Sequence, residues 1–70
     1  MERKHVNSSN INSIGYDEAN YLLEIEFKNG GIYIYSSVPK DAYNLIINAP
    51  SQGKYFNEYI RKEFACTRVK

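Results

Sequence analysis

The sequence predicts a single α+β domain in which a three-stranded antiparallel β-meander is followed by two C-terminal helices packed on one face of the sheet. The first observation is a hairpin signal, because Asn29-Gly30 separates two runs rich in β-branched and aromatic residues. The second is a change of periodicity at Val38-Pro39, after which apolar residues recur at helical spacing. The third is the length of 70 residues, which suits one small domain.

The strands are predicted in chain order as residues 10–17, 21–27 and 32–36, with a turn at residues 17–20. Gly15 inside the first strand indicates either a bulge or a close approach of another backbone. The polar residues 1–9 are expected to be loosely ordered. We therefore expect one domain over residues 1–70 with an ordered core at about residues 6–64.

Two helices are predicted after the meander. The first is a short helix after Val38-Pro39, because proline suits the first helical position, and Pro50 ends it. Ser51 is the predicted N-cap of the last helix, residues 52–66, and residues 67–70 form a tail. Glu63 interrupts the apolar side of that helix and predicts either fraying or a change of direction there. That apolar side consists of Tyr55, Phe56, Tyr59, Ile60 and Phe64.

The hairpin admits two registers, which place Tyr33 and Tyr35 on opposite faces of the sheet. A two-residue turn at Asn29-Gly30 puts both tyrosines on a partly wet face beside Glu24 and Glu26. A three-residue loop over residues 28–30, with Gly30 in the left-handed position, puts them in the core instead. The two tyrosines are therefore either a binding platform or part of the core.

Charge and cysteine content set broad limits on the protein. The net charge is only +1, but residues 17–26 hold four acidic residues and no base, whereas residues 54–70 hold five bases and two acids. The single cysteine, Cys66, permits no internal disulfide and favours a reducing compartment. Residues 1–10 lack the apolar core of a signal peptide, and no apolar run reaches transmembrane length. We expect a cytoplasmic protein that does not interact with membranes.

Catalytic and metal-binding patterns are weak in this sequence. His5 is the single histidine and lies in a polar stretch without an evident partner, so no serine is placed to be activated. One histidine with one cysteine does not form a metal cluster. We therefore expect no enzymatic activity, no cofactor and no metal ion.

The start of the last helix is the first candidate binding site. Free backbone N–H groups, the helix dipole, the small Gly53 and the cation of Lys54 would together favour an anion beside Ser51. The alternative is an ordinary capped helix.

Aromatic rings beside basic residues form the second candidate site. Tyr33 and Tyr35 on the sheet have, with the cations around it, the chemistry that binds single-stranded nucleic acid. These cations are Lys28, Lys54, Arg61 and Lys62. Bases stack on the rings and phosphates pair with the cations. Glu24 and Glu26 oppose this hypothesis in the register that places them beside the tyrosines, because carboxylates repel phosphate.

A set of motifs in a fixed order spans most of the chain. It consists of Ser9-Asn10-Ile11, Ile14-Gly15-Tyr16-Asp17, Phe27, Gly30, Tyr33-x-Tyr35, Val38-Pro39, Tyr43, Ala49, Ser51-x-Gly53-x-Tyr55-Phe56-Asn57 and Ile60. With these motifs the sequence resembles the KTSC domain family from about residue 6 to residue 64. That domain occurs at the C-terminus of some lysyl-tRNA synthetases and as small stand-alone bacterial proteins. The resemblance implies an RNA-binding module without catalytic residues, and its Tyr33-x-Tyr35 hallmark supports packing of those rings with Phe27.

The leading hypothesis is a non-catalytic module that binds RNA or another anionic partner. The alternative is a protein-interaction or self-associating module without a nucleic-acid role, which acts through an exposed tyrosine face or a sheet edge. The candidate nucleic-acid-binding residues are Lys28, Tyr33, Tyr35, Ser51, Gly53, Lys54, Asn57 and Arg61.

Overall fold

The central hairpin closes with a three-residue loop. In the computed structural model, which describes residues 2–70, strands β3 (Leu22–Phe27) and β4 (Ile32–Tyr35) pair with Leu23 opposite Tyr35 and Ile25 opposite Tyr33. Gly30 has a φ of 97°, a left-handed conformation that glycine adopts without a steric cost. The register with a two-residue turn is therefore wrong, and both tyrosines share the core face of the sheet.

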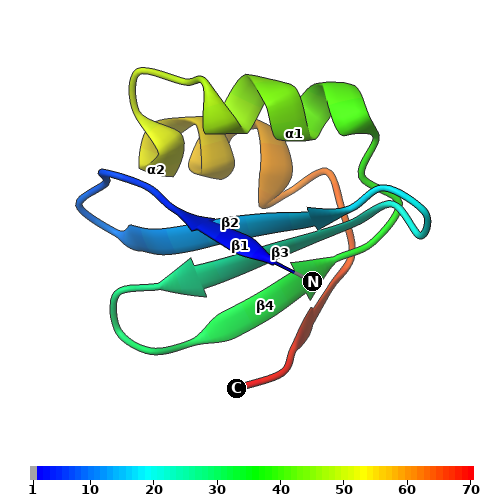
Figure 1. Cartoon of the computed structure of the whole chain (residues 1–70), viewed down its shortest axis with the longest axis horizontal. Coiled ribbons are helices and arrows are strands. Elements are labelled where there is room, and N and C mark those ends of the chain that lie inside the picture. Colours follow the sequence, from blue (N-terminus) through cyan, green and yellow to red (C-terminus); the bar gives the residue numbers. More distant parts are fainter. Residues whose placement is uncertain (1) are drawn as a thin grey trace.

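The sheet has five antiparallel strands in the order β1-β2-β3-β4-β5 (Figure 1). The predicted meander corresponds to β2 (Ile11–Asp17), β3 and β4. The prediction of only three strands is wrong, because β1 (Arg3–His5) pairs with β2 and β5 (Cys66–Arg68) pairs with β4. Both added strands are three residues long and polar, so they carry no alternating pattern that a sequence could display.

Gly15 lies where β1 crosses close to β2. It is opposite Arg3, and a Cβ at position 15 would lie 2.8 Å from both the Arg3 Cγ and the Glu2 backbone oxygen. The prediction of a close backbone approach is confirmed. The bulge lies elsewhere, between Ile11 and Ser13 in the pairing of β2 with β3.

The two predicted helices are present, but the second is shorter than expected. Helix α1 (Lys40–Ile47) follows Pro39, which occupies the N-cap rather than the first helical position. Helix α2 (Gln52–Tyr55) continues as a π-helical turn, η1 (Phe56–Ile60). The predicted helical end at residue 66 is wrong, because the chain turns after Ile60 and returns to the sheet as β5.

Both helices cover one face of the sheet and enclose the core (Figure 1). The predicted apolar side of the last helix is confirmed for Phe56 and Ile60, which are buried. It is wrong for Tyr59, which is 54% exposed, because the wider π-helical turn rotates this side chain away from the sheet. The buried core cluster consists of Ile11, Ile14, Leu23, Ile25, Tyr35, Val38, Ile46, Phe56 and Ile60.

Candidate nucleic-acid interface

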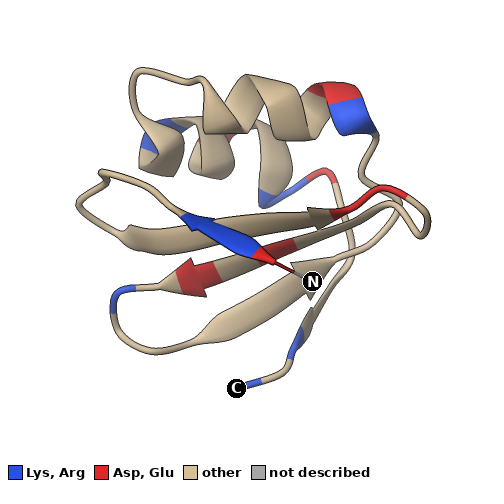
Figure 2. Ribbon diagram, in the orientation of Figure 1, with Lys and Arg blue, Asp and Glu red and all other residues tan. Residues whose placement is uncertain are grey.

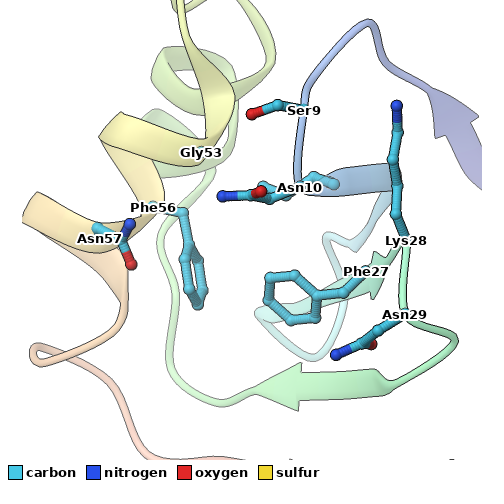
Figure 3. Close-up of a pocket in the computed structure, with 9 residues that line it drawn as sticks. Ser9, Asn10, Phe27, Lys28, Asn29, Gly53, Phe56 and Asn57 are labelled. Atoms are coloured by element: carbon cyan, nitrogen blue, oxygen red, sulfur yellow. The ribbon is translucent and has the colours of Figure 1, made fainter.

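Two pockets adjoin where the hairpin loop faces α2 and η1, and Figure 3 shows the first of them. We name the first, of about 300 Å³, the amide pocket and the second, of about 460 Å³, the tyrosine pocket. Phe27, Asn29 and Phe56 line both, so the two pockets adjoin at these residues, and we call them together the groove. The amide pocket is completed by Ser9, Asn10, Ile11, Lys28, Gly53 and Asn57, and the tyrosine pocket by Tyr33, Tyr35, Arg61 and Cys66.

The hairpin loop holds two polar side chains at the rim of the groove. The Phe27 N–H donates to the Gly31 carbonyl over 2.8 Å, and the Asn29 Oδ1 accepts the Gly31 N–H over 2.9 Å. The Lys28 N–H donates to the Asn10 carbonyl over 2.8 Å, which ties the loop to the start of β2. The side chains of Lys28 and Asn29 are consequently exposed at a position that the backbone fixes.

Edge-to-face aromatic contacts build the floor of the groove. The ring centroids of Phe27 and Phe56 lie 5.3 Å apart, those of Phe27 and Tyr33 5.7 Å, and those of Tyr35 and Phe56 5.5 Å. Such contacts stabilise the packed rings by about 0.5–1.5 kcal/mol each beyond their burial. Phe27 and Tyr33 are half-buried, so parts of both rings face the groove.

Basic side chains border the groove, and none of the residues within 2–70 that line either pocket is acidic. Figure 2 shows how the acidic and basic residues are distributed along the ribbon. Lys28 lines the amide pocket and Arg61 lines the tyrosine pocket, and both are exposed. The Arg68 guanidinium lies 5.6 Å from the centroid of the Tyr33 ring. Within residues 2–70, none of these three cations forms an ion pair.

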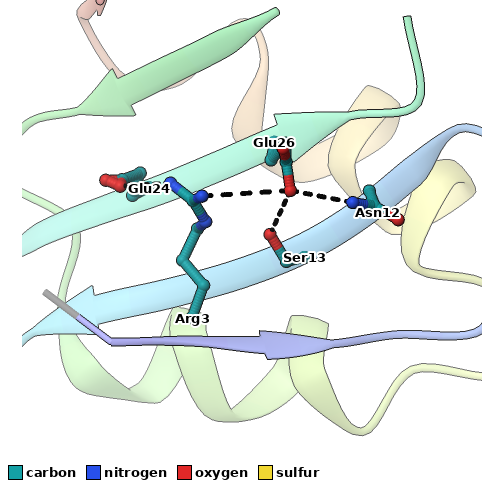
Figure 4. Close-up of polar contacts among 5 residues, drawn as sticks. All are labelled: Arg3, Asn12, Ser13, Glu24 and Glu26. Carbon is teal, nitrogen blue, oxygen red and sulfur yellow. Dashed lines mark hydrogen bonds and ion pairs between the residues drawn. The ribbon is translucent and has the colours of Figure 1, made fainter. Parts of the chain in front are cut away.

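Glu24 and Glu26 lie on the opposite face of the sheet, where polar neighbours hold them (Figure 4). Arg3 Nη1 donates to a Glu24 carboxylate oxygen over 2.8 Å. Asn12 and Ser13 each donate to Glu26 over 2.8 Å, and these hydrogen bonds hold the pKa of Glu26 below its usual value. The three-residue loop thus separates both carboxylates from the tyrosines and removes the repulsion that opposed phosphate binding.

The two hallmark tyrosines differ in their surroundings. Tyr35 is only 4% exposed and packs on Phe56, and burial is the main cause that raises its pKa to about 12. Tyr33 is half-buried and lies between Phe27 and Arg68. Tyr35 is therefore a core residue that borders the groove, whereas Tyr33 offers part of its ring to a ligand.

Two of the predicted site residues lie away from the groove. Ser51 and Lys54 line a third pocket with Tyr55 and Tyr59 on another side of α2. The Ser51 hydroxyl accepts the Lys54 N–H over 3.2 Å, so the predicted cap is confirmed. Because this cap already occupies one of the N–H groups that an anion would need, the helix start is a weaker anion site than the sequence suggested.

The groove also contains residues that the sequence did not identify as candidates for binding. Asn29 was interpreted only as a turn residue, although its side chain lines both pockets. Asn10, Phe27 and Phe56 belong to the family signature. Membership in that signature is the feature of the sequence that could have identified them as candidates for binding. Their meeting requires the fold, because they come from three separate parts of the chain.

No helix within residues 2–70 is long and apolar enough to cross a membrane. The described side chains include no group of three or more His, Cys, Asp or Glu residues that could hold a metal ion.

Comparisons with known proteins place this fold in a defined family. The family model described as the KTSC domain matches residues 7–64. The crystal structure of a KTSC domain protein from Yersinia pestis is 40% identical in sequence, superposes with a TM-score of 0.96, and is matched over 99% of this chain and 97% of that one.

Two further relatives are similar in sequence. An uncharacterized protein of Stutzerimonas stutzeri is 35% identical over 63 residues, which are 90% of this chain and 89% of that protein. A lysine–tRNA ligase of Nostoc punctiforme is 38% identical over 54 residues, which are 77% of this chain but 10% of the ligase. The ligase therefore contains a related segment as a small part of a much longer protein.

Proposed function

Because the chain belongs to the KTSC domain family, we propose that it is a non-catalytic module that binds single-stranded RNA in its groove. The observation that carries the proposal is the composition of the groove. Aromatic rings and unpaired cations line it together, while Glu24 and Glu26 lie on the opposite face. Single strands bind such surfaces by stacking bases on rings and pairing phosphates with lysine and arginine.

The related segment in a lysine–tRNA ligase supports an RNA partner. The name of that ligase states that tRNA is its substrate, and a small appended segment is well suited to hold RNA near a larger enzyme. In this chain the same role requires contact with phosphates from Lys28 and Arg61 and with bases at the aromatic floor. Lys54 and Ser51 lie outside this path, so we propose that they contribute little.

Self-association has less support. One form of this hypothesis requires an exposed face that carries both tyrosines, but Tyr35 is buried. The edge strand β1 carries Arg3, Lys4 and His5, and charged edge strands resist pairing with other sheets.

A titration of ¹⁵N-labelled protein with single-stranded RNA decamers at two salt concentrations tests the proposal. We expect shifts at Lys28, Tyr33 and Arg61 that weaken steeply as salt rises, and none centred on Ser51. An absence of shifts at low salt overturns the proposal. A mass that rises with protein concentration in the absence of RNA would favour the self-associating module instead.

A further inference from the structure

We propose that the amide pocket takes one unpaired nucleobase, whose polar edge is read by the side-chain amides of Asn10 and Asn57. This inference rests on the proposed function, which requires only that the groove binds RNA. It adds a position for one base and predicts a preference among bases.

The amides of the pocket are available to a ligand. Within residues 2–70, none of the hydrogen bonds involves the side-chain amide of Asn10 or Asn57, since Asn10 donates to Ser8 through its backbone N–H, and both residues are exposed. Asn29 uses its Oδ1 to accept the Gly31 N–H, which leaves its amino group free. A side-chain amide presents a donor beside an acceptor, and this pattern matches the edge of a base.

The shape of the pocket suits a flat ring. Figure 3 shows Asn10 between Ser9 and the ring of Phe56, with the Phe27 ring facing Phe56 from the hairpin side. The volume of about 300 Å³ lies at the small end of ligand pockets. A base that enters can pack against the half-buried Phe27 ring while its edge meets the amides.

Charge on both sides of the pocket fits the sugar-phosphate backbone of a strand. Lys28 lies at the amide pocket, and Arg61 lies in the adjoining tyrosine pocket. We therefore place the phosphates on either side of the bound nucleotide beside these two cations, Lys28 and Arg61. An occupant without phosphates would leave both cations unpaired, which favours a base within an RNA strand over a free apolar ligand.

Gly53 controls the width of the amide pocket. A Cβ at this position would lie 3.6 Å from the Ser8 Oγ and 3.7 Å from the Asn10 Nδ2, which is ordinary contact distance. Gly53→Ala therefore fits the folded protein and adds a methyl group against the amide of Asn10. Alanine also has a higher helix propensity than glycine, so this variant should fold at least as well as the parent chain.

The test measures the affinity of the full chain for labelled decamers of A, C and U by fluorescence anisotropy. We expect unequal affinities for the parent chain. Asn10→Ala and Asn57→Ala should each weaken binding of the preferred decamer by about 3- to 10-fold, the effect of one lost hydrogen bond. Gly53→Ala should also weaken it, because the added methyl group occupies space in the pocket beside the Asn10 amide. Their binding should keep the salt dependence of the parent chain. The matched control is Asn44→Ala on the exposed side of α1, which should leave every affinity unchanged.

The outcomes separate the two proposals. Salt-dependent binding that none of the three variants weakens beyond the Asn44→Ala control overturns the base pocket and leaves RNA binding intact. Equal affinity for all three decamers, retained in the variants, overturns it as well. A complete absence of binding to every decamer overturns the proposed function itself.

Discussion

Phe27 on β3 and Phe56 at the start of η1 meet edge to face, with 5.3 Å between ring centroids and 69° between ring planes. This contact joins the sheet to the second helix, and both of its rings line the amide pocket and the tyrosine pocket. Stability of the fold and shape of the groove therefore depend on the same pair of rings.

Replacement of Phe56 with alanine should be far more destabilising than the same change at Tyr59. Phe56 is 6% exposed, so Phe56→Ala should cost about 3–5 kcal/mol. Tyr59 is 54% exposed and contacts Tyr55, so Tyr59→Ala should cost about 1 kcal/mol or less. Urea unfolding measures both values. If both variants lose the same free energy of unfolding, Tyr59 is packed in the core, where an uninterrupted α-helix would place it.

A methyl group at position 15 should loosen the first strand. The added Cβ would lie 2.8 Å from the Glu2 backbone oxygen, so Gly15→Ala should destabilise the protein by about 1–3 kcal/mol and speed amide exchange in β1. The matched control is Gly53→Ala, which should stabilise the protein by about 0.5–1 kcal/mol. Unchanged amide exchange in β1 would contradict the close approach of the two strands.

The pKa of Glu26 predicts part of the acid sensitivity. Hydrogen bonds from Asn12 and Ser13 lower this pKa in the folded state below the ordinary value of 4.5. The ionised Glu26 carboxylate therefore stabilises the folded state fully above that ordinary value, and this stabilisation is lost as pH falls through the folded pKa. In Glu26→Gln the free energy of unfolding should decrease less steeply, as pH falls, than it does in the parent chain. The pKa of Asp17 is also lowered, so Asp17→Asn should remove a second, independent contribution to this pH dependence. If the free energy of unfolding of Glu26→Gln depends on pH as steeply as that of the parent chain, the account is contradicted.

The burial of Tyr35 predicts alkaline sensitivity. Its pKa is raised to about 12 from an ordinary value of 10, so the stabilisation is complete below the ordinary value and is lost as pH rises toward 12. Burial also raises the pKa of Tyr16, so an absorbance titration of tyrosine should show a late step to which both residues contribute. Tyr35→Phe should reduce the amplitude of that step, and an unchanged amplitude would contradict the burial of Tyr35.

The central part of the fold could be predicted from the sequence because its signals are local. Asn29-Gly30 marks the hairpin, and Ser51 marks a helix start, through interactions that span a few residues. The register could not be decided, because Asn-Gly suits both loop lengths. The edge strands β1 and β5 depend on pairing with distant strands, and a π-helical turn leaves no periodic signature over five residues.

The candidate site was predicted only in part for the same reason. Lys28, Tyr33, Gly53, Asn57 and Arg61 do line the groove. Their assembly, however, depends on the three-residue loop and on the turn after Ile60. Residue types and spacing left the loop length open between two alternatives, and they placed the change of direction at Glu63, three residues after the helical turn ends at Ile60.

The salt dependence of RNA affinity tests the central claim most directly. Lys28→Ala combined with Arg61→Ala should reduce the slope of log affinity against log salt by about 1.4, or about 0.7 for each lost phosphate contact on a single strand. The matched control, Lys40→Ala with Lys54→Ala, also removes two charges but lies outside the groove and should keep the parent slope. Equal reductions in both double variants would contradict a binding site in the groove.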